Sequence, residues 1–121
     1  MKRFIIEFYE KDTGECPVED FLLGLDKKMR AKILGIMDVL QEKGNLLREP
    51  HSKHLTDGIY EIRGKVGNNI SRVLFFFYYG GKIIVTNGFV KKTLKTPKSE
   101  IEKAKKYRND YIERCMKNEK I

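Results

Sequence analysis

The sequence predicts an α+β fold, in which helices pack on one face of an antiparallel meander sheet. The N-terminus alternates between apolar and polar residues, residues 17–44 have helical periodicity, and three strand-like runs follow one another between residues 59 and 91. Short turns between consecutive runs favour antiparallel pairing, because a parallel partner requires a long crossover. The expected order is β-α-α-β-β-β-α. The chain has 121 residues and single domains commonly span about 100–150, so we expect one domain over residues 1–121.

The first half of the chain supplies one strand and two helices. Alternation from Lys2 to Tyr9 predicts a strand with one mainly apolar face. Pro17 suits the first position of a short helix. Asp26 is a favourable N-cap for a longer helix, which is expected to end at Gly44. The apolar residues of both recur at helical spacing, which predicts a helical hairpin packed on the sheet.

The second half supplies the meander and a last helix. Residues 45–58 are expected to form a loop that holds both histidines. Strands are then expected at residues 59–63, 70–79 and 82–91. Gly80-Gly81 between two of these runs is a strong signal for a two-residue hairpin turn. Thr96 as N-cap and Pro97 at the first position predict the start of the last helix.

The positive charge is concentrated in the second half of the chain. The net charge is +8, yet residues 1–50 carry nine Lys and Arg against ten Asp and Glu. Residues 89–121 carry eleven against five. Such a cluster attracts polyanions, since phosphate contacts dominate nucleic-acid affinity through counterion release. The alternative interpretation is a lysine-rich surface that only confers solubility.

Several classes of protein are not favoured by the composition. The two cysteines, Cys16 and Cys115, match no metal-ligand spacing and are expected to be reduced thiols. The N-terminus does not resemble a signal peptide. The longest apolar run, Val73 to Tyr79, is far shorter than the roughly 20 residues that span a bilayer. We therefore expect a soluble cytoplasmic protein with no membrane partner, no metal and no cofactor.

Strand alternation gathers basic side chains on one face of the predicted sheet. If the helices cover the face to which Tyr60 and Val73 point, then Arg63 and Arg72 point to the uncovered face. Phe89 shares a parity with Lys91 in the last strand. The predicted site comprises Lys53, His54, Arg63, Arg72 and Lys91 for chemistry, and Phe89, Lys92 and Lys95 for binding RNA.

This mixture suits phosphoryl chemistry on RNA, because the ribose 2′-OH is an internal nucleophile that the protein only has to align. Guanidinium groups suit charged phosphate oxygens. A lysine or histidine can move protons, which typically contributes about 10²–10⁴-fold, and an aromatic ring can stack on a base. Each residue alone has a plainer explanation: Arg63 can pair with Glu61 or Asp57, and His54 can be a surface histidine.

Several motifs in order resemble the RelE/ParE toxin superfamily, and the chain is most similar to its HigB-type, phage-derived branch. The similarity is carried by Ser52–Leu55, Asp57–Arg63, Ser71–Phe75, Gly88–Thr93 and Lys95–Pro97. The resemblance implies a RelE-like fold and a toxin of a type II toxin–antitoxin system. It further implies metal-independent cleavage of mRNA on the ribosome by 2′-OH attack. The implied partner is a cognate antitoxin, often a helix-turn-helix protein.

The resemblance also implies roles for individual residues. Lys53 or His54 would move the proton, Arg63 and Arg72 would clamp the phosphate, and Lys91 with Lys92 would bind the backbone or assist the leaving group. The chain departs from the family pattern at Cys16, where a serine is usual. It also departs at Asn87 and Phe89, in the region where some relatives carry a late catalytic histidine or tyrosine. The identity of the general base therefore stays open.

Two other functions fit the same scaffold. One is a ParE-like DNA gyrase inhibitor without nuclease activity, and the other is a non-catalytic nucleic-acid-binding module. Retention of Lys53, Arg63 and Arg72 on one face favours RNA cleavage, because blocking a gyrase requires no phosphate clamp. In either toxin, a mostly acidic antitoxin segment is expected to cover the basic face or the last helix.

Overall fold

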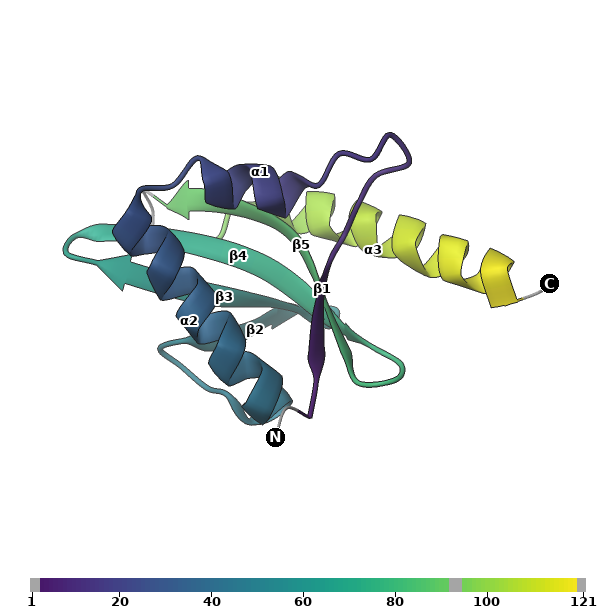
Figure 1. Ribbon diagram of the computed structural model, residues 1–121, viewed down its shortest axis with the longest axis horizontal. Coiled ribbons are helices and arrows are strands. Elements are labelled where there is room, and N and C mark those ends of the chain that lie inside the picture. The colour runs from purple at the N-terminus through teal and green to yellow at the C-terminus, as the bar shows by residue number, and fades with distance from the viewer. Residues whose placement is uncertain (1–2, 92–94, 120–121) are drawn as a thin grey trace.

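A computed structural model describes residues 3–91 and 95–119 of the protein. Figure 1 shows a twisted sheet with two helices in front and a long helix that extends from behind it toward the C-terminus. The elements are β1 (Ile5–Phe8), α1 (Pro17–Leu23), α2 (Lys27–Lys43), the 3₁₀ turn η1 (Gly44–Leu46), β2 (Ser52–Thr56), β3 (Ile59–Val66), β4 (Asn69–Tyr78), β5 (Lys82–Lys91) and α3 (Lys98–Glu119). The predicted α+β class is confirmed.

The sheet has five strands in the order β1-β5-β4-β3-β2. β1 runs parallel to β5, and the strands from β5 to β2 are antiparallel, as the predicted meander requires. β2 was not predicted, because residues 52–56 were expected to lie in a loop. It is an edge strand of mostly polar residues, and such strands lack the apolar alternation by which buried strands are recognised.

Helices cover both faces of the sheet. On one face, α1 and α2 enclose a core that includes Val18, Ile33 and Phe75. On the other face, Leu74 packs in a second core with Tyr111 of α3. The prediction that the helices share one face is therefore correct for α1 and α2 and wrong for α3. The physical reason is the continuous apolar run of β4, which buries both of its sides.

The helix boundaries follow from local chemistry. Pro17 is the first residue of α1, and the Asp26 carboxylate caps α2 by accepting a hydrogen bond from the Met29 backbone N–H at 2.8 Å. Gly44 follows α2 with a φ of 55°, a conformation that favours glycine. α3 begins at Lys98, one residue later than predicted. No helix in the described part of the chain is long and apolar enough to cross a membrane.

A polar cluster fixes α3 to the start of the chain. The buried Tyr9 stacks on Tyr107 with ring centroids 4.7 Å apart, and its hydroxyl donates to Asp110 Oδ2 at 2.6 Å. Arg114 binds the same carboxylate at 2.6 Å. Burial, together with the hydrogen bond to Asp110, raises the pKa of Tyr9 to about 12. These contacts connect residues about a hundred positions apart, so they hold α3 against the sheet.

Candidate functional site

The strand register brings both predicted arginines together. Arg63 of β3 lies directly opposite Arg72 of β4, which in turn lies opposite Phe89 of β5. Lys53 of β2 lies opposite Glu61 of β3. Directly opposed residues point to the same side of a sheet. These five residues therefore share one face, on the side away from α1 and α2, where α3 covers the neighbouring part.

A buried carboxylate connects the two arginines. Glu61 is fully buried, and its Oε2 accepts hydrogen bonds from Arg63 Nε at 2.8 Å and from Arg72 Nη1 at 2.7 Å. Its Oε1 accepts a hydrogen bond from the Thr96 hydroxyl at 2.6 Å. Burial alone would raise the pKa of Glu61, but the hydrogen bonds from Thr96, Arg63 and Arg72 outweigh it and lower that pKa. Glu61 is therefore an anion at neutral pH.

The same contacts revise two predictions made from the sequence. Glu61 was expected only as one possible partner of Arg63, whereas it binds both arginines. Thr96 was expected to cap α3, but its hydroxyl donates to Glu61 and accepts from Arg72 Nη1 at 3.1 Å. The first turn of α3 instead uses the Pro97 carbonyl, which accepts from the backbone N–H groups of Glu100 and Ile101.

The two arginines differ in exposure. The side chain of Arg72 is 5% exposed, and that of Arg63 is 25% exposed. Arg63 is therefore the arginine that presents more of its guanidinium to the surface. Arg72 contributes mainly as the buried partner of Glu61.

A hollow of about 350 Å³ opens beside these arginines at the uncovered end of β3. It is lined by Lys32, Pro50, His51, Arg63, Lys65, Ile70 and Arg72. Among the described residues that line it, every ionisable side chain is basic or a histidine. Such a lining favours an anionic group with several oxygens, since guanidinium and ammonium groups make charge-assisted hydrogen bonds to phosphate.

Three ionisable residues of this hollow were not predicted from the sequence, namely Lys32, His51 and Lys65. Lys65 has the same strand parity as Arg63, which was an available signal. Lys32 lies on α2, and His51 is placed by the backbone hydrogen bond from Arg63 N to His51 O at 3.0 Å. Neither position follows from a periodicity, because both depend on how α2 and the segment before β2 pack against the edge of the sheet.

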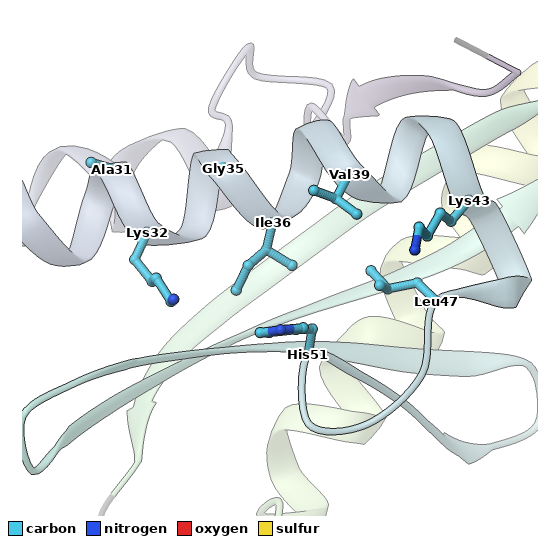
Figure 2. Close-up of a pocket in the computed structure, with 8 residues that line it drawn as sticks. All are labelled: Ala31, Lys32, Gly35, Ile36, Val39, Lys43, Leu47 and His51. Carbon is cyan, nitrogen blue, oxygen red and sulfur yellow. The ribbon is translucent and has the colours of Figure 1, made fainter. Parts of the chain in front are cut away.

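A second groove adjoins the hollow. Figure 2 shows it between α2 and the segment that carries Leu47 and His51, with the imidazole of His51 below Ile36. The groove has a volume of about 490 Å³, and it shares Lys32 and His51 with the arginine hollow. His51 therefore lines both depressions.

An exposed carboxylate lies at the rim of the site. Glu49 Oε1 is 3.8 Å from Lys53 Nζ and 4.0 Å from Arg63 Nη1. The Glu49 side chain is 61% exposed, and solvent screens pairs of this kind strongly. Lys53 is thus available at the surface on the same face as Arg63.

His54 does not join this group. It lies opposite Tyr60 in the β2–β3 pair, on the face of the sheet that α2 covers. Its ring meets the Tyr60 ring at a centroid distance of 4.9 Å, and its Nε2 accepts a weak hydrogen bond from Gly58 N at 3.3 Å. Lys53 and His54 were both expected at the rim of the site formed by Arg63 and Arg72. Lys53 lies on the face of these arginines, whereas His54 lies on the opposite face, because neighbouring strand residues point to opposite sides.

The remaining predicted residues surround the end of β5. Phe89 is half-buried at the edge of the second core, and Lys95 is exposed. The backbone of Lys91 pairs with Ile70, which brings this end of β5 beside the hollow. Lys92 lies outside the described residues. In the described part of the chain, no group of three or more His, Cys, Asp or Glu side chains is arranged to hold a metal ion.

Asn87 occupies the region where a late catalytic residue was considered. Its side chain is 3% exposed, and its Nδ2 donates to Glu100 Oε1 at 3.0 Å. Its Oδ1 accepts from the Thr86 hydroxyl at 2.7 Å. Asn87 therefore connects β5 to the first turn of α3, and its polar atoms are used within the fold.

The family model described as phage derived protein Gp49-like (DUF891) matches residues 20–109, which is most of the chain and includes α2, every strand from β2 to β5 and the first half of α3. No curated protein matches the sequence.

Proposed function

The chain belongs to the family of phage-derived Gp49-like proteins, a toxin-like family, and from this premise we propose that it is the toxin of a type II toxin–antitoxin system and cleaves mRNA on the ribosome. The observation that carries the proposal is the hollow in which Arg63 and Arg72 lie with Lys32, His51 and Lys65. The positive charge of the site complements the negative charge of an RNA phosphate. The neighbouring Phe89 adds a ring against which a base can stack.

The proposed reaction uses the substrate's own nucleophile. The 2′ oxygen attacks the adjacent phosphorus, and the bond from phosphorus to the 5′ oxygen breaks. The products are a 2′,3′-cyclic phosphate and a free 5′ hydroxyl. One proton leaves the 2′ hydroxyl and one is delivered to the departing 5′ oxygen, so the protein has to accept one proton and donate another.

Arg63 is proposed to bind the phosphate oxygens, because it is the more exposed of the two arginines. Charge that develops on those oxygens in the transition state is stabilised by donors held in place beforehand. Lys53 and His51 are the proposed proton carriers, since the first shares the face of Arg63 and the second lines its hollow. His54 is not proposed for this role, because it lies on the opposite face.

The lysines near the end of β5 are proposed to bind the RNA backbone. Lys91, Lys92 and Lys95 follow Phe89 in the sequence and carry three further positive charges. Several phosphate contacts make affinity fall steeply with salt. Binding to ribosomes should therefore weaken strongly between about 50 and 200 mM salt, and a flat response would contradict the role given to these lysines.

The nuclease activity is tested by inducing the protein in bacteria and mapping mRNA 5′ ends. Wild type should produce cuts phased with codons, and Arg63→Ala should abolish them. Lys117→Ala is the matched control, because it removes one exposed positive charge from the end of α3. Growth arrest without new 5′ ends would overturn the nuclease proposal and favour a gyrase inhibitor. No effect on growth or mRNA would favour a non-catalytic binding module.

A cognate antitoxin is the proposed partner. The net charge of +8 and the clustering of basic residues after position 88 favour a partner with an acidic segment. Co-expression with the product of the adjacent reading frame should yield a complex that withstands purification and suppresses the growth defect. Purification of the toxin alone under these conditions would contradict the proposed partner.

A further inference from the structure

Glu61 gathers three donors that come from three parts of the chain. Its Oε2 binds Arg63 Nε of β3 and Arg72 Nη1 of β4, and its Oε1 binds the Thr96 hydroxyl in the segment before α3. The three distances lie between 2.6 and 2.8 Å, and the carboxylate is fully buried. Charge-assisted hydrogen bonds of this length are strong and directional. The carboxylate therefore has little freedom to move.

This arrangement constrains the guanidinium of Arg63. An arginine side chain loses considerable rotamer freedom when it binds a ligand in a fixed geometry. Here Nε is already held by Glu61, which fixes the plane of the guanidinium before any ligand arrives. Arg63 is among the residues that line the hollow, and its Nη1 lies 4.0 Å from Oε1 of the exposed Glu49.

Arg72 and Thr96 offset the free-energy cost of burying the Glu61 carboxylate. An unpaired buried charge is strongly destabilising, whereas a pair with satisfied hydrogen bonds is not. Arg72 is almost fully buried and supplies the opposite charge, and Thr96 satisfies the second oxygen. The remaining positive charge of Arg63 is then directed to the surface.

We propose that Glu61 is a positioning residue for RNA cleavage: held by Arg72 and Thr96, it aligns the Arg63 guanidinium for the scissile phosphate. This inference rests on the proposed function. It differs from a role in charge balance, in which any anion at position 61 suffices. It also differs from a purely structural role, in which a change at position 61 alters only the amount of folded protein.

Glu61→Asp separates geometry from charge. Aspartate keeps the negative charge but withdraws the carboxylate by about 1.5 Å, the length of one carbon–carbon bond. A misplacement of this size can cost about 100-fold in rate. In a single-turnover assay on bacterial ribosomes programmed with a short mRNA, we expect the saturated cleavage rate to fall at least tenfold. The protein concentration that gives half-saturation should stay within about threefold of wild type, as for an interaction made in the transition state.

A second pair of variants leaves the charged groups unchanged. Thr96→Val removes the hydroxyl at nearly constant shape, and Thr96→Ser retains it. We expect Thr96→Val to lower the saturated rate about three- to tenfold. Thr96→Ser should have the wild-type rate. Wild-type rates in both Glu61→Asp and Thr96→Val would overturn the proposal. Losses that match the fall in folded fraction, measured by circular dichroism at the assay temperature, would assign Glu61 a structural role and overturn it as well.

A spectroscopic readout tests the alignment without any cleavage. In ¹⁵N NMR spectra, the Nε–H proton of Arg63 should exchange slowly with water in wild type and at least tenfold faster in Glu61→Asp. Arg108, on α3, serves as the internal reference. If wild type cleaves no RNA but Arg63 responds, the proposed function fails and the alignment stands. If wild type cleaves RNA and the exchange of Arg63 is unchanged by Glu61→Asp, the positioning role is wrong.

Discussion

Gly88→Ala tests how closely α1 is packed on the sheet behind the candidate site. Gly88 lies in β5 opposite Val73, one residue before Phe89. A Cβ built on Gly88 would lie 2.6 Å from Cε2 and 3.0 Å from Cγ of Phe21 in α1. Carbon atoms in good contact are about 3.5–4.0 Å apart. The ring of Phe21 therefore has to move by about 1 Å, and α1 has to adjust with it.

The expected cost follows from two opposing terms. Overpacking a well-packed core costs typically about 1–3 kcal/mol. Replacing glycine by alanine also restricts the unfolded chain, which returns about 0.5–1 kcal/mol. We therefore expect the free energy of unfolding to fall by about 1 kcal/mol, and by no more than about 2.5 kcal/mol. Urea denaturation measures this as a lower midpoint with an unchanged slope.

Gly35→Ala provides the matched control. Gly35 lies within α2, and no heavy atom would lie within 4 Å of its added Cβ. This variant should stabilise the protein by about 0.5–1 kcal/mol, since alanine is the better helix former. The clash itself is isolated by repeating Gly88→Ala in a Phe21→Ala background, where the loss should disappear. Equal stabilities of the two glycine variants, or additive effects of Gly88→Ala and Phe21→Ala, would refute the packing argument.

Three further predictions concern pH and charge. The pKa of Tyr9 is raised to about 12, so the unfolded protein loses this proton from about pH 10 while the folded protein keeps it. The free energy of unfolding should therefore fall between pH 10 and 12, by up to about 1.4 kcal/mol per pH unit. Free energies of unfolding measured across this pH range should show this slope. A Tyr9→Phe variant with an undiminished slope would argue against assigning it to Tyr9. His51→Gln should lower the cleavage rate at least about tenfold while His54→Gln leaves it unchanged, and a reversed order in single-turnover rates would contradict the geometry. Glu49→Gln should strengthen RNA binding about two- to fivefold at low salt and have no effect at 1 M salt; a gain that persists at high salt would show that the rim carboxylate acts by another route.

Most of the fold was predictable from the sequence because its signals are local. Period-two alternation located β1 and β3, whereas aromatic and β-branched composition located β4 and Ile/Val-rich composition located β5. The capping residues Asp26 and Gly44 located the ends of α2. The position of α3 was not predictable in this way. The apolar residues of α3 recur at helical spacing, which indicates that one side of this helix is buried. Only the burial of β4 on both of its sides decides that α3 packs on the face opposite α1 and α2.

The candidate site was predictable to the extent that it depends on strand parity. Alternation and register alone bring Arg63 beside Arg72 and Lys53 opposite Glu61. Alternation also separates His54 from Lys53, so treating the two as equivalent loop residues was the error, and it followed from missing β2. A strand assigned to residues 52–56 would have placed Lys53 and His54 on opposite faces, and its register with β3 decides that Lys53 is the one on the face of Arg63.

The roles of the two arginines required three-dimensional information. By sequence they are equivalent, as two basic residues on one face. Glu61, however, is a buried anion between the two. It neutralises the charge of Arg72, which is buried with it, and orients Arg63, which reaches solvent. With Arg72 and Glu61 balancing each other, the charge that an RNA phosphate meets in the hollow comes from Arg63 and from its neighbours Lys32 and Lys65. Substitutions of Arg72 should therefore act through the stability and alignment of the site, whereas substitutions of Arg63 should act on the phosphate directly.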